Sequence, residues 1–342
     1  MIRGHAAVRE ALRNTDFYSS DLQGDADVRD YRQLPLEVDP PIHHAYRAAL
    51  SPLFVKPKIE SLAPQFADIA SELIHSFEKR GGGNFLDDIA LRYVVTCLGV
   101  IFDRPQDVDE WISWGAGVWD TETGERSGAN LHGYLERVFE ESAHSNANDV
   151  WTFVRAIEIN GKPLTFEQFK GIGSVCLAGG RDTVVKLISG SVWHLLQDQN
   201  NLELLQSKEV QIREAIPELL RYLTPLPGML RVTPDQQPLE DSARAPEQFT
   251  EISFASANFD ETVFSHPDTI DLKRGRVPHM AFGFGPHTCI GNAIAEIETE
   301  VILTQLLDKL PQWKFASEPE IQWLSVGQYQ FPGHFASLNI KC

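Results

Sequence analysis

Basic residues are scarce in this chain of 342 residues, which has 30 Lys and Arg, 48 Asp and Glu, and a formal net charge of −18. Nucleic-acid binding needs a basic surface because each phosphate contact is made by a positive group. An anionic membrane surface attracts basic segments for the same reason. We therefore expect neither a nucleic acid nor a membrane as a partner, and we assign the acidity to solubility.

Cysteine is also scarce. The four cysteines, Cys97, Cys176, Cys289 and Cys342, are far apart and form no CxxC pair. That spacing argues against a zinc site and against a disulfide framework. Residues 1–10 contain no apolar segment of the kind that a signal peptide needs. We therefore expect a reducing, cytoplasmic compartment.

Long apolar runs are missing too. The longest, Ile89–Phe102, is interrupted by Arg92 and is too short to cross a bilayer, so it predicts a buried helix. The hydrophobic share of 42% is still ample for a sizeable core. Length alone allows one or two domains, and we expect a single domain over residues 1–342.

Helical periodicity dominates what is present, and we find no internal repeat. The only clear strand pattern is the partial alternation of Phe249–Ala257. The prediction is a mainly α chain with small β-sheets. Apolar residues recur at helical spacing in Ala6–Arg13, His43–Phe54, Ile59–Phe77, Asp87–Phe102, Leu131–Glu141, Glu209–Tyr222 and Asn292–Leu310.

The longest predicted helix runs from Thr165 to Leu196. Thr165 and Gln168 form a capping-box pattern, in which each side chain serves an otherwise unpaired backbone N–H. Between Lys170 and Arg181 the helix carries no charge. A helix that is apolar all round is buried, so we expect it to cross the middle of the protein.

A glycine-rich loop precedes Cys289 and reads Phe282-Gly-Phe-Gly-Pro-His-Thr-Cys-Ile-Gly291. Glycines let a backbone approach a flat ligand closely. The loop ends where the last predicted helix begins, and the free N–H groups of a helix start stabilise a thiolate. A thiolate is the form in which cysteine binds iron. The alternative is a buried structural cysteine beside a turn.

Within this loop, Phe282, Gly285, Cys289 and Gly291 resemble the FxxGxxxCxG ligand loop of the cytochrome P450 family. The resemblance implies the cytochrome P450 fold and heme b (iron protoporphyrin IX) as the cofactor. It implies that Cys289 is the iron ligand, that Phe282 and Gly291 lie against the heme, and that His287 contacts a heme propionate.

Glu218 and Arg221 are three residues apart, so they are neighbours on a helix and can form an ion pair. Such pairs are common on protein surfaces. This one resembles the ExxR motif of the same family, which clamps the loop ahead of the ligand cysteine. The resemblance implies a structural role for both residues.

Residues 179–183 read Gly-Gly-Arg-Asp-Thr in the middle of the longest predicted helix. Two glycines weaken a helix, and a simple kink or close helix packing would explain them. The segment also resembles the [A/G]GxDT oxygen-activation motif, although Val184 stands where many members have a second threonine. The resemblance implies that Asp182 and Thr183 are catalytic residues that deliver protons with water admitted at a helix break.

His43 and Arg47 share one face of a predicted helix because they are four residues apart. Two cations there suit a carboxylate, although a surface pair is the alternative. The segment resembles the DPPxHxxxR stretch of the family, with Ile42 in place of an acidic residue. The resemblance implies propionate binding by His43 and Arg47, with His44 as a competitor, and by Arg231 farther along.

Two further features concern the extent of the resemblance. Residues 257–268 resemble the stretch ANRDPxVFxxPD, with Phe259 in place of arginine and Thr262 near the proline position. Ala6–Phe17 resembles the B helix, which members usually place after an A helix and two strands. We therefore expect an N-terminally shortened P450 fold in which the strand at Phe249–Ala257 lacks its usual neighbours. Its edge would pair with a second copy in a weak homodimer, be covered by a rearranged local segment, or be covered by residues upstream of Met1.

The implied function is that of a monooxygenase that inserts one oxygen atom from O2 into a small, apolar organic substrate. Electrons would come from a ferredoxin or flavodoxin-type donor with its reductase. A peroxide-driven peroxygenase and a non-catalytic heme-binding or sensor protein are the alternatives, and the Asp182–Thr183 pair argues against both.

The segment from Trp114 to Leu131 is short, which predicts a small lid. The residues expected to line the pocket are Val175, Cys176, Gly179, Leu226, Gly228, Met229 and Leu230, and those expected to form a basic patch for the donor are Lys56, Lys58, Arg274 and Arg276.

Overall fold

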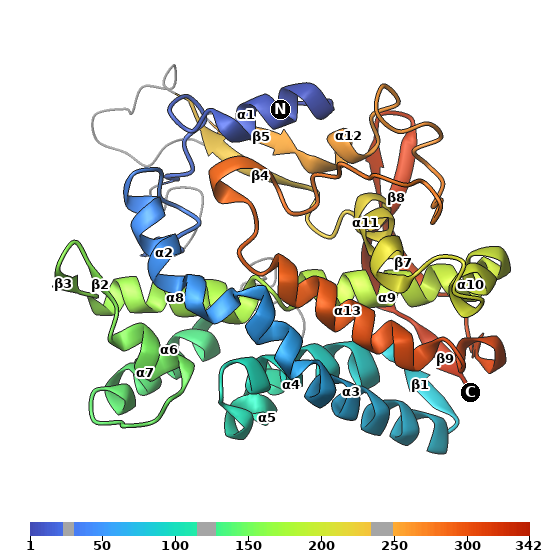
Figure 1. Ribbon diagram of the computed structural model, residues 1–342, viewed down its shortest axis with the longest axis horizontal. Coiled ribbons are helices and arrows are strands. Elements are labelled where there is room, and N and C mark those ends of the chain that lie inside the picture. Colours follow the sequence, from blue (N-terminus) through green and yellow to red (C-terminus); the bar gives the residue numbers. More distant parts are fainter. Residues whose placement is uncertain (23–30, 115–127, 234–248) are drawn as a thin grey trace.

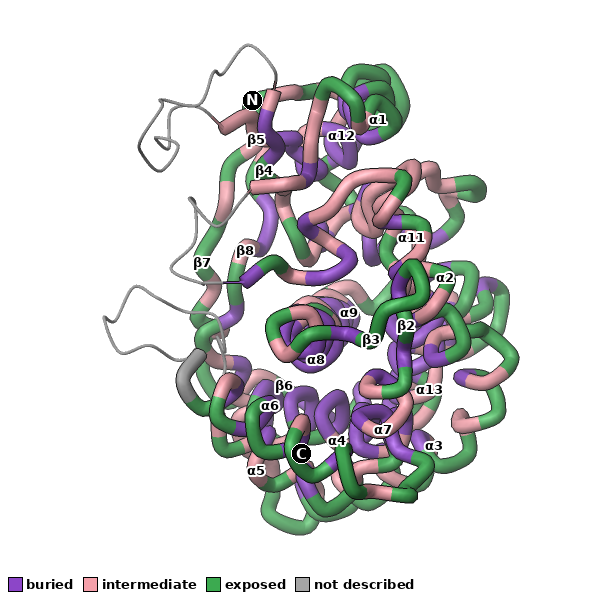
Figure 2. Tube along the Cα trace, turned by 90° about the vertical axis from the view of Figure 1, so that its left-hand side faces the viewer, coloured by how far each residue is buried: buried purple, intermediate pink, exposed green. Residues whose placement is uncertain are grey.

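The computed structural model describes residues 1–22, 31–114, 128–233 and 249–342. Helices make up most of it, and Figure 2 shows α8 (Phe166–Ala178) and α9 (Asp182–Gln197) end-on near the middle, with other elements on all sides. The remaining helices, drawn in Figure 1, are α1 (His5–Arg13), α2 (Ile42–Phe54), α3 (Lys56–Lys79), α4 (Arg92–Ile101), α5 (Val108–Ser113), α6 (Gly128–Ser142), α7 (Val150–Arg155), α10 (Gln199–Gln206), α11 (Ile212–Leu223), α12 (Phe254–Asn258) and α13 (Asn292–Leu306). A π-helix at Leu86–Leu91 and short 3-10 turns at Pro105–Asp107, Gly285–His287 and Leu310–Gln312 complete them.

The strands are short and pair antiparallel in small sheets. In the described chain, β1, β9 and β6 form one three-stranded sheet, and β2–β3, β4–β5 and β7–β8 form two-stranded ones. This agrees with a mainly α prediction with small sheets. The strands are β1 (Gly82–Asn84), β2 (Glu158–Ile159), β3 (Lys162–Pro163), β4 (Gly228–Val232), β5 (Phe249–Ser253), β6 (Lys314–Phe315), β7 (Glu320–Val326), β8 (Tyr329–Ser337) and β9 (Asn339–Lys341).

The longest predicted helix is two helices, which corrects the expectation of one. Its predicted capping box is present: the Thr165 hydroxyl accepts from the Gln168 N–H, and the Gln168 side chain accepts from the Thr165 N–H. α8 ends at Ala178 and α9 begins at Asp182. The break falls on the glycine pair because glycine stabilises helix less than any residue except proline.

The predicted strand at Phe249–Ala257 is also shorter than expected. It ends at Ser253, whose hydroxyl accepts a hydrogen bond from the Ser256 N–H and so begins the short helix α12. A serine at this position favours a helix start over a continued strand. The predicted helix from Asp87 likewise begins as a π-helix before it becomes α4 at Arg92.

The edge of β5 is partly covered by the first residues of the chain. The Ile2 N–H donates to the Glu251 carbonyl over 2.7 Å, and the Ser253 N–H donates to the Ile2 carbonyl over 3.1 Å. Ser19 makes a similar bridge to Val232 on β4. Of the outcomes expected for this edge, cover by a local segment is the one that the structure shows near Ile2, which weakens the reason for expecting a dimer through β5.

The hydrophobic core anchors α13, the helix that follows Cys289. α13 packs against α3, α9 and α11, and its Ile302, Leu303 and Leu306 are fully buried. Each such side chain contributes at most about 1.5–3 kcal/mol. Because the helix is held along its length, its first turn fixes the position of the loop that precedes it.

Two expectations from the sequence concern the lid and membrane-crossing helices. The small lid predicted between Trp114 and Leu131 falls largely on residues 115–127, which lie outside the described residues. Within the four described stretches, none of the helices combines the length and the apolar character that a membrane crossing would require.

Candidate functional site

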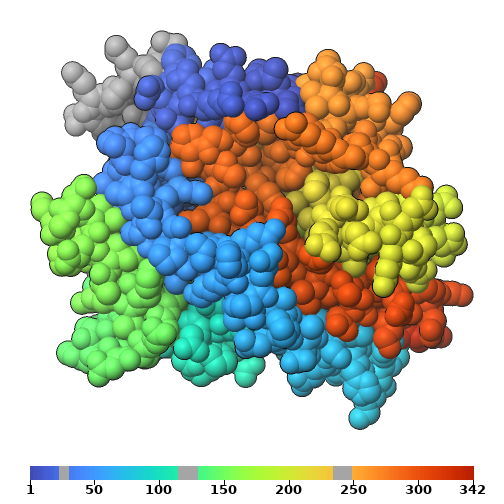
Figure 3. Space-filling view, viewed as in Figure 1, coloured from blue at the N-terminus to red at the C-terminus, as the bar shows by residue number. Residues whose placement is uncertain are grey.

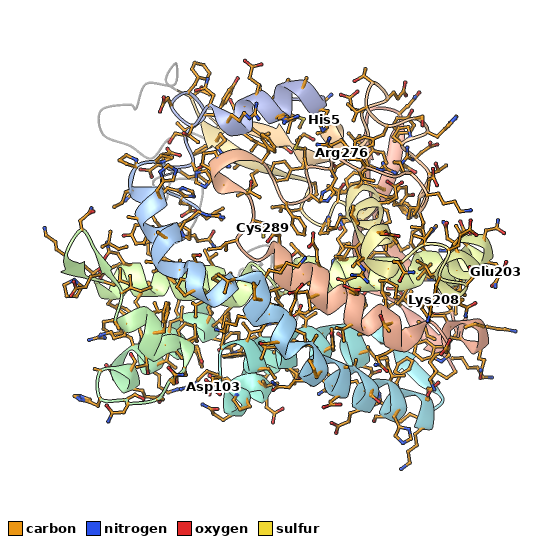
Figure 4. The ribbon with its side chains drawn as sticks, in the orientation of Figure 1. His5, Asp103, Glu203, Lys208, Arg276 and Cys289 are labelled. Atoms are coloured by element: carbon orange, nitrogen blue, oxygen red, sulfur yellow. The ribbon has the colours of Figure 1, made fainter. Side chains whose placement is uncertain are left out.

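The loop before Cys289 is held by its own backbone and by α1. The Cys289 N–H donates to the Phe282 carbonyl over 2.9 Å, which closes the loop. Gly285 has a φ of 75°, and a Cβ there would lie 2.6 Å from the Leu12 carbonyl oxygen. Only glycine therefore fits this position. Figure 4 shows Cys289 near the centre of the molecule, where α13 begins.

Cys289 is an exposed residue, although burial by the surrounding protein is the largest influence on the pKa of its thiol. Burial raises the pKa of Cys289, while the backbone N–H of Gly291 and the charge of Arg47 act in the opposite direction. The thiolate is therefore favoured only when a further positive group lies nearby, as a bound metal ion does.

Arg47 reaches the same loop from α2. Its guanidinium donates to the carbonyl oxygen of Thr288 over 2.6 Å. The side chain thus holds the residue directly before Cys289, and burial lowers the pKa of Arg47 while the Cys289 thiolate would raise it. The contact in the structure is with the loop backbone, which the sequence did not predict.

A buried cluster of potential cations lies beside the loop. The His43 and His287 rings are 4.1 Å apart between centroids. Both ring nitrogens of His43 are buried without a hydrogen-bond partner among the described residues. Burial, then the charges of His287 and Arg47, lower the pKa of His43 to about 3. Arg231 is 3% exposed, and burial lowers its pKa to about 10. Unpartnered buried donors of this kind fit an added anion.

Asp39 balances only part of this cluster. One of its oxygens lies 3.7 Å from His287 Nε2, and the other accepts from the Ser19 hydroxyl. The Ser20 hydroxyl lies 3.1 Å from the same His287 nitrogen. His44 is exposed, so it is His43 that lies against His287. A ligand that brings two carboxylates and an iron beside Cys289 fits this set of residues, and heme b is such a ligand.

The helix break between α8 and α9 carries the predicted catalytic pair. Thr183 Oγ1 donates to the Gly179 carbonyl over 3.2 Å, and Gly179 is exposed although most of α8 is buried. The side chain of Asp182 is 42% exposed and lies 3.7 Å from Arg181 Nε. Arg181 itself is buried and donates to the Trp111 carbonyl over 3.0 Å. An accessible carboxylate and hydroxyl thus lie where the central helices separate.

The predicted pair of Glu218 and Arg221 forms as expected and is almost fully buried. Two guanidinium nitrogens donate to the two carboxylate oxygens over 2.8 Å each. The same guanidinium donates to the carbonyls of Asn258, Pro267 and Thr269 over 2.8–2.9 Å. One side chain therefore fixes three points of the chain between β5 and the Cys289 loop.

The sequence missed two members of this network. Arg274 donates to Glu218 Oε1 over 3.0 Å, and its side chain is only 10% exposed. The prediction that Arg274 belongs to a surface basic patch is therefore wrong, because its charge is used internally. Asn258 accepts from the Met280 N–H over 2.6 Å and so ties the network to the segment that leads into the Cys289 loop.

The residues expected to line a pocket fall into three groups by exposure. Gly179, Leu226 and Leu230 are exposed, with 39% exposure for each leucine. Ligand pockets are lined mainly by apolar side chains, and these two leucines have the apolar character that such a lining needs. Cys176 is 7% exposed, which leaves little of it to contact a ligand. Val175, Gly228 and Met229 are half-buried.

Comparison with known proteins agrees with this geometry. A family model described as Cytochrome P450 matches residues 187–320. The probable cytochrome P450 127A1 of Sinorhizobium fredii is 29% identical over 313 residues, which cover 90% of this chain and 75% of that protein. The steroid C26-monooxygenase of Mycobacterium tuberculosis is 24% identical over 93% of this chain and 88% of that protein. A solved structure described as a carbohydrate active P450 is 28% identical, with a TM-score of 0.88 over 99% of this chain and 91% of that one. Together with the loop of Cys289, the break at Gly179 and the Glu218–Arg221 pair, these likenesses show that the chain belongs to the cytochrome P450 family of heme monooxygenases.

Proposed function

We propose that Cys289 is the thiolate ligand of the heme iron and that the chain, as one domain over residues 1–342, oxygenates a small apolar molecule. The observation that carries this is the pairing of an accessible cysteine in the protein interior with buried, unpartnered nitrogens on His43. Heme with a thiolate ligand supplies the activation of dioxygen. The side chains around it bind, orient and supply protons.

The cluster of His43, His287 and Arg231 would hold the heme propionates. His43, His287 and Arg231 are buried or half-buried beside one another, and a carboxylate would give the His43 nitrogens the partner that they lack. Arg47 would act on the cofactor partly through the Thr288 carbonyl that it holds. Phe282 and Gly291, on either side of Cys289, would pack against the heme.

Asp182 and Thr183 would deliver protons at the helix break. Their side chains are accessible to solvent, and the Thr183 hydroxyl donates to the carbonyl of Gly179, where α8 ends. A hydroxyl and a carboxylate within reach of water can pass a proton in a site that is otherwise dry. A peroxide-driven enzyme and a heme sensor need no such pair, so the pair favours the monooxygenase.

The test of iron ligation is the carbon-monoxide difference spectrum of the reduced protein. The wild-type chain should show the strongly red-shifted Soret band of a thiolate-ligated heme. Cys289→Ser should abolish that band. Cys342→Ser should keep it, because Cys342 is the last residue of the sequence and lies outside the site. A Cys289→Ser protein that kept the band would overturn the proposal.

The electron donor would dock on the face over the Cys289 loop. Figure 3 shows α1, the segment before α13 and α2 adjoining on this face. Arg9 and Arg13 of α1 are exposed, and their guanidinium carbons lie 4.6 Å and 4.8 Å from the Phe284 ring centroid. These two charges are in contact with the loop itself, through Phe284. An acidic ferredoxin or flavodoxin with its reductase would fit such a local positive patch.

The rate of reduction by an acidic ferredoxin tests this surface. It should fall as salt rises, because exposed charges are screened within ~8 Å at physiological ionic strength. Arg13→Gln should lower the rate at low salt. Lys208→Gln is the control, since Figure 4 shows Lys208 far from Cys289. Equal rates in both variants, or a rate that salt does not change, would refute the docking site.

The substrate would be apolar because Leu226 and Leu230 expose large hydrophobic side chains. A spin-shift screen of the ferric protein against terpenoids, steroids and sugars tests this choice. Binding of sugars alone would contradict it and would instead follow the carbohydrate active structural relative. Turnover with ferredoxin, reductase and NAD(P)H, compared with turnover by peroxide, separates a monooxygenase from a peroxygenase, and no turnover by either route would indicate a sensor.

A further inference from the structure

Lys186 is a buried lysine that the proposed chemistry does not use. It lies on α9, one turn after Thr183, and is 8% exposed. Its Nζ donates to the carbonyl oxygen of Thr224 over 3.1 Å and lies 5.6 Å from the Phe331 ring centroid. Lysine is almost never buried without a carboxylate partner. Because burial of an ammonium group costs free energy, we looked for a role that this lysine performs.

The partner of Lys186 begins the candidate pocket wall. Thr224 is fully buried and ends α11 in the left-handed conformation, with a φ of 37°. The next residues, 225–230, include the exposed Leu226 and Leu230 and run into β4. The lysine therefore attaches the start of this wall to the helix that carries Asp182 and Thr183.

Thr224 also joins the network that supports the Cys289 loop. Its hydroxyl donates to the Arg221 carbonyl over 2.6 Å and accepts from the Asn258 side chain over 3.0 Å. Asn258 in turn accepts from the Met280 N–H over 2.6 Å. A continuous line of buried hydrogen bonds thus leads from Lys186 to the segment before Cys289.

Resting on the proposed function, we propose that Lys186 is a positioning residue that sets the pocket wall at residues 225–230 against the oxygen-activating helix. In its charged form it holds the Thr224 carbonyl by a charge-assisted hydrogen bond, which is stronger than the bond of a neutral amine. When the charge is lost, the wall is held less firmly. Ligand affinity then depends on the protonation of this amine.

The amine titrates near neutrality. Burial lowers the pKa of Lys186 to about 7, and burial is the cause of that shift in the part of the chain that the structure describes. The fraction that is charged therefore changes across the physiological range. The titratable groups on the neighbouring turns of α9 and α11 and along β8 are Asp182, Glu218, Arg221, Tyr222, Tyr329 and His334.

The test measures binding of metyrapone, a neutral pyridine ligand, to the ferric heme protein from about pH 6 to about pH 9. The affinity of the wild-type protein should fall roughly fivefold as pH rises through about 7, a coupling at the lower end of those between sites in one protein. Lys186→Met should give the weak, high-pH affinity at every pH. Lys186→Arg keeps its charge throughout and should give the tight, low-pH affinity. Lys170→Met is the matched control, because Lys170 has the same 8% exposure but lies on α8 rather than α9, and it should keep the pH dependence.

Persistence of the wild-type pH dependence in Lys186→Met would overturn the proposal. If that variant does not fold, persistence of the dependence in Lys186→Arg overturns it equally. The carbon-monoxide spectrum separates this failure from that of the proposed function. A wild-type protein without the thiolate band refutes the heme assignment. If the band is normal and the Lys186→Met variant keeps the wild-type pH dependence of ligand affinity, only the role of Lys186 is refuted.

Discussion

Replacing Arg221 by alanine should remove most of the stability of the protein. The guanidinium is 0% exposed and makes five hydrogen bonds, two to Glu218 and three to backbone carbonyls. After the substitution the Glu218 carboxylate stays buried, and its partners within the described stretches are Arg274 and the Asp271 N–H. The three carbonyls lose the donor that holds them together.

The magnitude follows from these contacts. Removing one partner of a buried ion pair costs about 3–5 kcal/mol. Each buried carbonyl left unpaired adds about 1–3 kcal/mol before water or rearrangement compensates it. These contributions overlap, yet together they rival the roughly 5–15 kcal/mol by which whole domains are stable. Arg221→Lys keeps the charge but not the planar fork, so we expect a smaller loss of about 2 kcal/mol or more.

Urea unfolding followed by circular dichroism measures this loss, and heme retention reports on the site. Arg213→Ala is the control on the same helix, since its side chain is 71% exposed and its nearest carboxylate, Glu300, is 4.0 Å away. Such an exposed pair contributes within about 0.5 kcal/mol. The reasoning fails if Arg221→Ala and Arg213→Ala unfold at the same urea concentration.

Features that depend on neighbours along the chain could be predicted from the sequence. The capping box of Thr165 and Gln168 needs only a spacing of three residues, and the Glu218–Arg221 pair needs only one helical turn. Both are present. The choice between His43 and His44 could also have been made, because His43 shares the buried spacing of Tyr46 and Leu50.

Features that depend on distant segments could not. Arg274 looked like a surface charge until the fold brought Glu218 within 3.0 Å of it, 56 residues away. The role of Asn258 depends on Arg221, Thr224 and Met280 meeting around it. A single sequence shows each polar residue and its spacing but not which partner the packed core brings to it.

The remaining predictions concern the catalytic pair, the ligand loop and a buried acid. Thr183→Ala should divert reducing equivalents from product into peroxide, since the ordered hydroxyl is lost; an unchanged ratio of product to NAD(P)H consumed would contradict this. Gly285→Ala should lower stability and heme retention, because its Cβ would lie 2.6 Å from a backbone carbonyl. Gly275→Ala has a similar φ of 79°, and its Cβ would have no atom of the described residues within 4 Å, so it should cost less. The difference between their urea midpoints measures the clash alone. Glu298→Gln should stabilise the protein more at about pH 8 than at about pH 5. The Glu298 carboxyl is fully buried, neither oxygen has a hydrogen-bond partner among the described residues, and burial raises its pKa well above the usual value. The folded protein therefore binds this proton more tightly than the unfolded chain does, so the stabilising effect is complete below the unfolded pKa and is lost as pH rises toward the folded one. Glutamine has no proton to lose and removes that dependence. The control is Glu300→Gln on the same helix, whose side chain is 41% exposed and which should show no pH-dependent gain. An equal gain for Glu298→Gln at both pH values would mean that this carboxyl is already charged in the folded protein.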